Sequence, residues 1–329
     1  MKIIQFIKDN KCNVGYVEGE KVNIIKNFNL SYDLFNEAIN SGEKIENLIE
    51  KIKSIDTLNY QEIYNSNLLL PPITHKDPSH FYVTGTGLTH LGSADSRNKM
   101  HATKEEEMTD SMKMFKIGIE GGKPAKGKVG AQPEWFYKGN GDNISSPTEN
   151  IYIPEFSLDG SEEPEVVGIY MINDKEEVVK IGYSIGNEFS DHVMEKQNYL
   201  YLAHSKLRQC SFGPEINLGK IPEEVKGISK VIRDNKVIWE KEFLSGEKNM
   251  SHSIENLEHH HFKYEIFRKP GDLHIHYFGT ATLSFSDGIK AKDGDIFEIS
   301  SDTCVMPLRN KLKIKAKENI TFKNLINLN

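Results

Sequence analysis

The alternation of hydrophobic and polar positions predicts a chain built mainly from short strands. Residues 166–172 and 178–185 are two apolar, β-branched runs separated by Asn173-Asp174, which is typical of a β-hairpin. Further strand-like runs occur at residues 2–7, 14–17, 22–25, 81–83, 230–239, 273–278 and 296–299. Tight turns separate these runs, and no βαβ series is visible, so the pattern indicates an α+β protein that is mainly β.

Helical periodicity is confined to a few segments. One predicted helix begins with Ser31 as its cap, and after a break near Gly42 apolar residues at helical spacing resume from Ile45 to Ile52. Pro71-Pro72 cannot continue a helix and marks a linker. We therefore predict a small N-terminal α/β domain over residues 1–72 and a larger domain over residues 73–329.

Composition and charge narrow the function classes. The 329 residues are 37% hydrophobic and 27% charged, so a core can form, and the net charge of −7 disfavours nucleic acid or an anionic membrane as the partner. The three cysteines are far apart and form no disulfide framework, which favours a reducing compartment. No apolar run approaches the roughly 18 residues of a membrane helix, and the N-terminus lacks a signal-peptide pattern. We expect a cytoplasmic protein.

An acidic cluster precedes the predicted hairpin. Glu163 and Glu165 occupy positions i and i+2, which point to the same face of a strand. Glu188 follows the second strand of the hairpin, so the three acids could hold a divalent cation such as Mg²⁺. The alternative is a solvated acidic turn, because Asp159 and Glu162 lie in the same stretch.

A second polar segment begins after the strand pattern at residues 81–83. Gly85 and Gly87 allow a positive φ or the close approach of a ligand, although the segment lacks the spacing of a phosphate loop. Candidate chemistry follows at Thr89, His90, Ser93, Asp95, Arg97 and His101. Each of these side chains could instead be a surface or capping residue.

The stretch 102–150 is polar and rich in glycine and proline. We interpret it as a long loop or a lid over a binding site. Lys138 within it could meet an anionic substrate or could be an ordinary surface lysine. His259–His261 are predicted to lie on a helix that covers a sheet, in preference to a metal site.

Several motifs, taken together, resemble those of the fumarylacetoacetate hydrolase (FAH) family. Glu163-Pro-Glu165, Asn187-Glu188 and Lys206 resemble that family's metal and lysine motifs. The stretch from Gly271 to Asn310, with the pattern GD…GT…G…K.GD.FEI…PLRN, resembles its C-terminal motif. The stretches GTGLTH, PEWFYKG and HHHFKY are similar to a subgroup linked to sugar-acid catabolism, which includes 2-keto-3-deoxy-pentonate dehydratases.

This resemblance implies a fold, a cofactor and a reaction class. It implies an FAH-type mixed β-sandwich roll, usually a homodimer, around Mg²⁺ or Mn²⁺ held here by Glu163, Glu165 and Glu188. The implied substrates are small 2-oxo acids whose oxygens chelate the metal, which stabilises an enolate. Both a dehydratase and a C–C bond hydrolase can use that enolate.

The sequence departs from the family pattern in three places. The usual aspartate ligand is Glu188, a usual arginine is His192, and the hydrolases' NYxxHAxE segment is replaced by residues 88–95. Without the His–Glu pair of that segment, water attack has no obvious base, which favours elimination.

The first hypothesis is therefore a Mg²⁺-dependent dehydratase of a 2-keto-3-deoxy sugar acid such as 2-keto-3-deoxy-L-arabonate. Its predicted catalytic residues are Lys206, His90 and Ser93, and its predicted substrate-binding residues are Thr89, Arg97, Lys138, Gly279 and Thr280. The alternative is a C–C bond hydrolase of a 2,4-diketo acid, in which His90 or His101 activates water. A sugar-acid binding protein without turnover is a third hypothesis.

Overall fold

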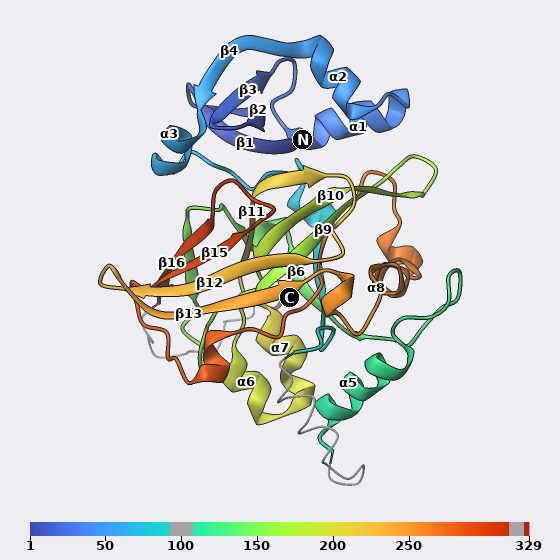
Figure 1. Ribbon diagram of the computed structural model, residues 1–329, viewed down its shortest axis with the longest axis vertical. Coiled ribbons are helices and arrows are strands. Elements are labelled where there is room, and N and C mark those ends of the chain that lie inside the picture. Colours follow the sequence, from blue (N-terminus) through green and yellow to red (C-terminus); the bar gives the residue numbers. More distant parts are fainter. Residues whose placement is uncertain (93–107, 316–325, 329) are drawn as a thin grey trace.

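The computed structural model describes residues 1–92, 108–315 and 326–328, and two sheets dominate it (Figure 1). The larger sheet has the order β4 (Lys53–Asn59), β3 (Lys21–Ile25), β2 (Lys11–Glu18), β1 (Lys2–Lys8), β11 (Cys210–Leu218), β10 (Val178–Asn187), β9 (Pro164–Ile172), β14 (Leu273–Tyr277), β5 (Phe81–Gly87) and β6 (Glu134–Asn140), with β7 (Ile144–Ser145) beside β11. The smaller sheet has the order β13 (Lys236–Ser245), β12 (Val225–Arg233), β15 (Ile296–Ser301), β16 (Leu308–Ile314) and β8 (Asn150–Ile153). The prediction of a mainly β fold is confirmed.

The helices lie around the sheets. They are α1 (Ser31–Ser41), α2 (Ile45–Ile52), α3 (Tyr60–Asn65), α5 (Asp110–Gly121), α6 (His192–Gln197), α7 (Leu202–Lys206) and α8 (Ile254–Phe262). As predicted, α8 covers the larger sheet, because its Leu257 and Phe262 join a core cluster with Val166 and Tyr170 of β9. Among the described residues, no helix is long and apolar enough to cross a membrane.

The N-terminal unit shares a sheet with the rest of the chain. The first strand, β1, pairs antiparallel with β11 at Lys2↔Asn217 and Ile3↔Ile216, and the unit lies above the larger body in Figure 1. The domain boundary near residue 72 stays a prediction. The proposed capping role of Ser31 is wrong: Leu30 occupies the N-cap position, and the Ser31 hydroxyl donates to the Pro72 carbonyl at 2.7 Å.

The interpretation of residues 102–150 as a long loop is wrong for several segments, of which the short strand β7 is the last within it. Residues 110–121 form α5, whose N-terminus is capped by the Thr109 side chain, and residues 134–140 form β6, paired with β5. Gly118 is the only buried residue of α5, so its apolar side chains form no buried face of helical spacing that the sequence could reveal. The first residues of the stretch, 102–107, lie outside the described part of the chain.

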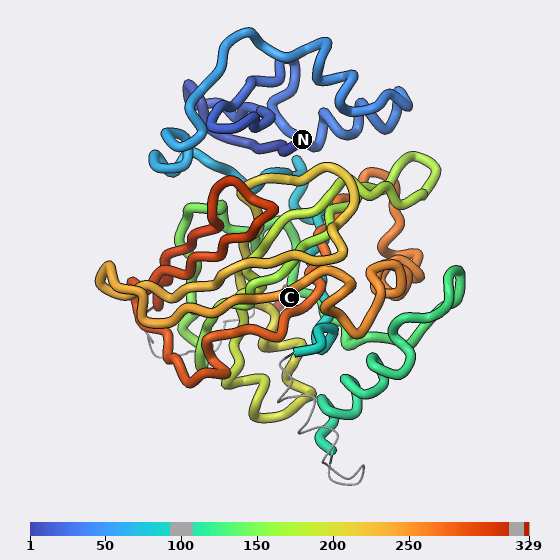
Figure 2. The backbone as a smooth tube through the Cα atoms, viewed as in Figure 1, coloured from blue at the N-terminus to red at the C-terminus, as the bar shows by residue number. Residues whose placement is uncertain are grey.

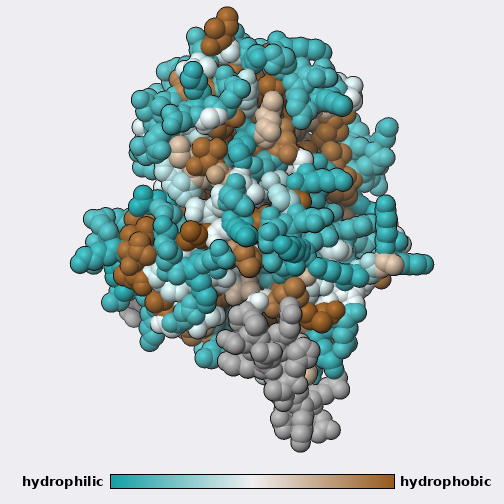
Figure 3. Space-filling view, viewed as in Figure 1, coloured by the Kyte–Doolittle hydropathy of each residue, from teal (hydrophilic) through white to brown (hydrophobic). Residues whose placement is uncertain are grey.

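The two sheets stack, with β12 and β13 running across the larger sheet in the backbone view (Figure 2). Polar side chains cover most of the face in Figure 3, interrupted by scattered apolar groups. The largest core cluster lies between the N-terminal helices and the larger sheet, and includes Phe35, Ile169, Phe212 and Tyr277. These layers fix the strands whose ends carry the site.

Candidate metal and catalytic site

The β9–β10 hairpin brings the three predicted metal ligands together. Glu165 lies opposite Gly186 in the ladder, and the Glu188 N–H donates to the Glu163 carbonyl at 3.0 Å just beyond the paired strands. One carboxylate oxygen from each of Glu163, Glu165 and Glu188 lies within 4.8 Å of the others. All three side chains are buried, so the alternative of a solvated acidic turn is wrong.

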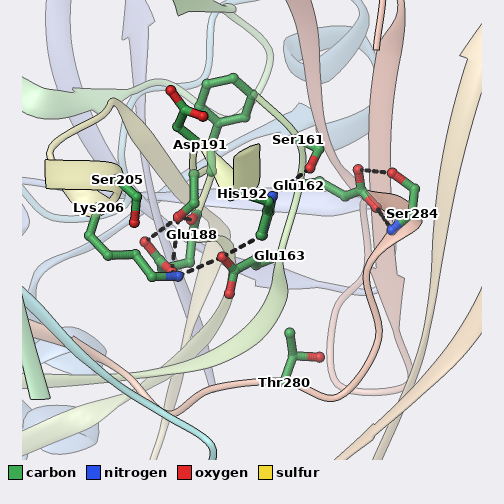
Figure 4. Close-up of polar contacts among 12 residues, drawn as sticks. Ser161, Glu162, Glu163, Glu188, Asp191, His192, Ser205, Lys206, Thr280 and Ser284 are labelled. Carbon is green, nitrogen blue, oxygen red and sulfur yellow. Dashed lines mark hydrogen bonds and ion pairs between the residues drawn. The ribbon is translucent and has the colours of Figure 1, made fainter. Parts of the chain in front are cut away.

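Two buried lysines neutralise part of this negative charge. The Nζ of Lys206 lies 2.6 Å from Oε1 of Glu163 and 2.5 Å from Oε2 of Glu188 (Figure 4). The Nζ of Lys138 lies 2.6 Å from Oε1 of Glu188. Burial disfavours the charged form of Lys206, but Glu163 and Glu188 outweigh it and raise its pKa well above the usual value. Lys206 is therefore held in its protonated form in this arrangement.

Lys138 is neither a surface lysine nor placed to bind substrate. Its side chain is fully buried, and besides Glu188 its Nζ donates to the carbonyls of Phe189 at 2.6 Å and Lys206 at 3.0 Å. These acceptors use all three N–H bonds of the ammonium group. Its charge favours the ionised form of Glu188 and so opposes the burial that raises the pKa of that carboxyl.

Among the described residues, no lysine forms an ion pair with Glu165. Its pKa is raised well above the usual value, first by burial and then by the charges of Glu188 and Glu163. The backbone N–H of Gly279 donates to its Oε2 at 2.6 Å. The prediction that this N–H binds a substrate carboxylate is therefore not supported, because it is already bonded to Glu165.

The cluster fits a divalent metal. Three carboxylates offer the hard oxygen donors that Mg²⁺ prefers, and they converge on one buried position. The repulsion that raises the pKa of Glu165 is the kind of unfavourable energy that a bound cation removes. Glu163, Glu165 and Glu188 would hold the ion.

Sequence reasoning missed a fourth acid, Glu134. Alternation along β6 places Glu134, Phe136 and Lys138 on one face, and the Phe136 ring lies 4.9 Å from Nζ of Lys206. Tyr199 donates its hydroxyl hydrogen to Oε2 of Glu134 at 2.7 Å. Burial raises the pKa of Glu134 to about 7, while the Tyr199 hydrogen bond and Lys206 oppose the shift. Glu134 is therefore a candidate proton-transfer group.

Thr89 and His90 bond to protein groups, and Thr89 contacts the segment that follows β14. The Thr89 hydroxyl donates to the Phe278 carbonyl. The Nδ1 of His90 lies 3.0 Å from the Thr89 hydroxyl, and its Nε2 lies 2.9 Å from the Ser245 hydroxyl. Burial lowers the pKa of His90 to about 3. With both ring nitrogens bonded to protein groups, a catalytic role for His90 and a substrate contact for Thr89 are not supported.

The remaining predicted residues divide into two groups. Thr280, labelled in Figure 4, directly follows Gly279, whose N–H donates to Glu165, and it is partly exposed. Ser93, Arg97 and His101 lie outside the described residues.

Two further residues of the site, His192 and Glu162, form contacts that the sequence did not predict. His192 Nε2 lies 2.9 Å from Oε1 of Glu163, and its Nδ1 lies 2.8 Å from the Ser161 hydroxyl. Glu162 accepts hydrogen bonds from both the N–H and the hydroxyl of Ser284, at 2.9 and 2.7 Å (Figure 4). The sequence had marked His192 only as the replacement for an arginine of the FAH pattern, and Glu162 only as part of a possible acidic turn.

One curated protein is similar in sequence to part of this chain. No family model matches the chain. It is 30% identical to 2-dehydro-3-deoxy-D-arabinonate dehydratase of Saccharolobus solfataricus over 193 residues, which cover 56% of this chain and 61% of that protein. The match thus spans less than two thirds of the relative's length.

Solved structures extend the similarity in fold to nearly the whole chain. A structure of 2-keto-3-deoxy-D-arabinonate dehydratase complexed with magnesium and 2,5-dioxopentanoate matches 96% of this chain and 100% of its own, at 20% identity and a TM-score of 0.70. A 5-carboxymethyl-2-hydroxymuconate delta-isomerase from Mycobacterium smegmatis matches at 16% identity, over 96% of this chain and 100% of its own, with a TM-score of 0.59. The predicted fold class and the resemblance to such enzymes are confirmed.

Proposed function

We propose that this chain is a Mg²⁺-dependent dehydratase of a 2-keto-3-deoxy sugar acid. The observation that carries the proposal is the buried cluster of Glu163, Glu165 and Glu188 flanked by Lys206 and Glu134. The similarity to a dehydratase solved with magnesium and a 2-oxo acid supports the same assignment. Mn²⁺ is the alternative cation, since it also accepts oxygen donors.

The three carboxylates would hold the ion. When bound, the metal supplies Lewis-acid polarisation of the 2-oxo acid, which makes the proton at C3 more acidic. Thr280, at the partly exposed start of the segment after β14, would contact the substrate carboxylate.

Proton transfer is assigned to Glu134 and Lys206. The Glu134 carboxylate, with a pKa of about 7, would accept the C3 proton, and the Tyr199 hydroxyl hydrogen bond would orient it. Lys206, held protonated by Glu163 and Glu188, would donate a proton to the leaving C4 hydroxyl. The C3–H and C4–O bonds break, a C3=C4 double bond forms, and water leaves. The resulting 5-hydroxy-2-oxo-3-enoate would lose a proton from C5 and gain one at C3, and the C4=C5 enol so formed would tautomerise to a 2-oxo semialdehyde.

The hydrolase alternative has less support. A C–C bond hydrolase needs a group that activates water, and His90, its first candidate, has both ring nitrogens bonded to protein hydroxyls. The second candidate, His101, lies outside the described residues. Homodimer formation and a cytoplasmic location stay predictions from the sequence.

The test is product detection by NMR with purified protein. The D and L forms of 2-keto-3-deoxy-arabinonate and an acylpyruvate would each be offered with Mg²⁺, with Mn²⁺ and with chelator. A 2-oxo semialdehyde formed only with metal is the expected result. Pyruvate released from the acylpyruvate would mean hydrolysis, and binding without any product would mean a sugar-acid binding protein.

A further inference from the structure

The segment from Gly279 to Gly288 is attached to the acidic cluster at three points. The Gly279 N–H donates to Glu165 at 2.6 Å, and Ser284 donates its N–H and hydroxyl hydrogens to Glu162. The Phe285 ring stacks on His192, with 5.1 Å between centroids and 20° between planes. Each attachment therefore leads to a predicted metal ligand, to its neighbour in sequence, or to a side chain bonded to it. Figure 4 shows the one between Ser284 and Glu162.

Glu162 makes the strongest of these attachments. Its carboxylate is fully buried, and both oxygens accept hydrogen bonds, Oε1 from the Ser284 N–H and Oε2 from the Ser284 hydroxyl. A buried carboxylate without a cationic partner is unfavourable unless hydrogen bonds compensate it. No lysine or arginine forms an ion pair with it among the described residues. The two hydrogen bonds from Ser284 thus compensate the cost of burying the Glu162 carboxylate.

The two neighbouring acids, Glu162 and Glu163, bond to different parts of the molecule. Glu163 bonds to Lys206 and His192 inside the cluster, whereas Glu162 bonds to Ser284 on the segment after β14. Thr280 lies between the two hydrogen-bonded attachments at residues 279 and 284. Its hydroxyl oxygen accepts the Thr282 N–H at 3.2 Å, so the turn that carries it is itself ordered.

We propose that Glu162 is a positioning residue: it holds Ser284, and thereby sets the place of Thr280 beside the metal ligands for binding the substrate carboxylate. This inference rests on the proposed function, because Thr280 acts on a substrate only if the cluster is an active site. It gives Glu162 a role distinct from the neighbouring metal ligand Glu163.

The experiment compares Glu162→Ala with Glu162→Gln. The glutamine can accept the Ser284 N–H through its oxygen and donate to the Ser284 hydroxyl through its nitrogen, so it should keep the attachment. Glu162→Ala removes both hydrogen bonds between Ser284 and the Glu162 carboxylate. We therefore expect amide exchange of residues 279–288 to become about tenfold faster and KM to rise about tenfold. The kcat and the Mg²⁺ affinity should change less than about threefold, and Glu162→Gln should restore KM and exchange.

Two further variants complete the design. Ser284→Ala removes only the hydroxyl bond and should show a smaller change in the same direction, which keeps the test available if Glu162→Ala does not fold. Glu37→Ala, at an exposed position of α1, is the control and should match the wild type. Unchanged exchange and KM in Glu162→Ala, or failure of glutamine to restore them, would overturn the inference. If the wild type turns over no sugar acid, the proposed function fails, while hydrogen exchange still reports whether Glu162 holds the segment.

Discussion

A Cβ atom on Gly87 would lie 1.9 Å from Oε1 of Glu134, which faces it across the β5–β6 ladder. Gly85 has the same relation to Phe136, whose ring would lie 2.4 Å from such an atom. Neither glycine has a positive φ, so the requirement is for space. The GTG stretch therefore makes room for site side chains of β6, where the sequence suggested a turn or a close ligand.

This relationship predicts that Gly87→Ala will lower turnover by displacing the Glu134 carboxylate. We expect a loss of about 100-fold in kcat, the lower end of what a positioned acid–base group contributes. The check is a double variant: Gly87→Ala combined with Glu134→Gln should be no slower than Glu134→Gln alone. Additive losses would mean that Gly87 acts on something other than Glu134.

The pH dependence of kcat should report Glu134. As a base it must be ionised, so the rate should rise with pH through about 7, the pKa to which burial raises it. Tyr199→Phe removes a hydrogen bond that favours the ionised form and should move this limb to higher pH. A limb that stays in place in Tyr199→Phe would point to another group.

Mg²⁺ should stabilise the fold through the carboxylate cluster. At 100 times Kd, binding contributes about 2.7 kcal/mol, which corresponds to a rise of roughly 4 °C in Tm for a chain of this length. Glu165→Gln should abolish most of this rise and all metal-dependent turnover, whereas Glu37→Gln at an exposed position should keep both. A full Mg²⁺ response in Glu165→Gln would remove the metal assignment.

Stability should fall in mild acid because several histidines are buried in the neutral form. Burial lowers the pKa of His90 and His261 to about 3, and that of His274 and His276 well below the usual value. The unfolded chain binds protons near pH 6.5 and the folded chain does not, so stability is lost as pH falls below 6.5. Each such histidine costs up to about 1.4 kcal/mol per pH unit in that range.

Urea unfolding at pH 7 and pH 5 measures this effect. His261→Gln should reduce the difference between the two free energies of unfolding, whereas His259→Gln, at an exposed position, should leave it unchanged. An unchanged difference between pH 7 and pH 5 in His261→Gln would contradict the prediction. The wild-type difference also contains the opposite effect of buried carboxyls such as Glu134 and Glu165, whose raised pKa values favour the folded state in acid.

The sequence allowed the metal cluster to be predicted because its geometry is local. Strand alternation places Glu163 and Glu165 on one face, and a hairpin brings Glu188 to the same end. Glu134 and Glu162 were missed because their roles depend on β6 lying beside β5 and on Ser284 returning to the hairpin. Such long-range pairings leave no periodic trace in the chain. Lys138 was misjudged for the same reason, since its partner Glu188 lies 50 positions away.

The pairing of β1 with β11 has a consequence for truncated forms of the protein. Removing residues 1–72 would strip the backbone of Ile216 and Asn217 of its partners and take Tyr60 from its 2.5 Å hydrogen bond to the buried Glu215. An exposed edge strand of this kind can pair with a strand of another chain. The N-terminal unit therefore also guards against aggregation, and the larger body without it should self-associate.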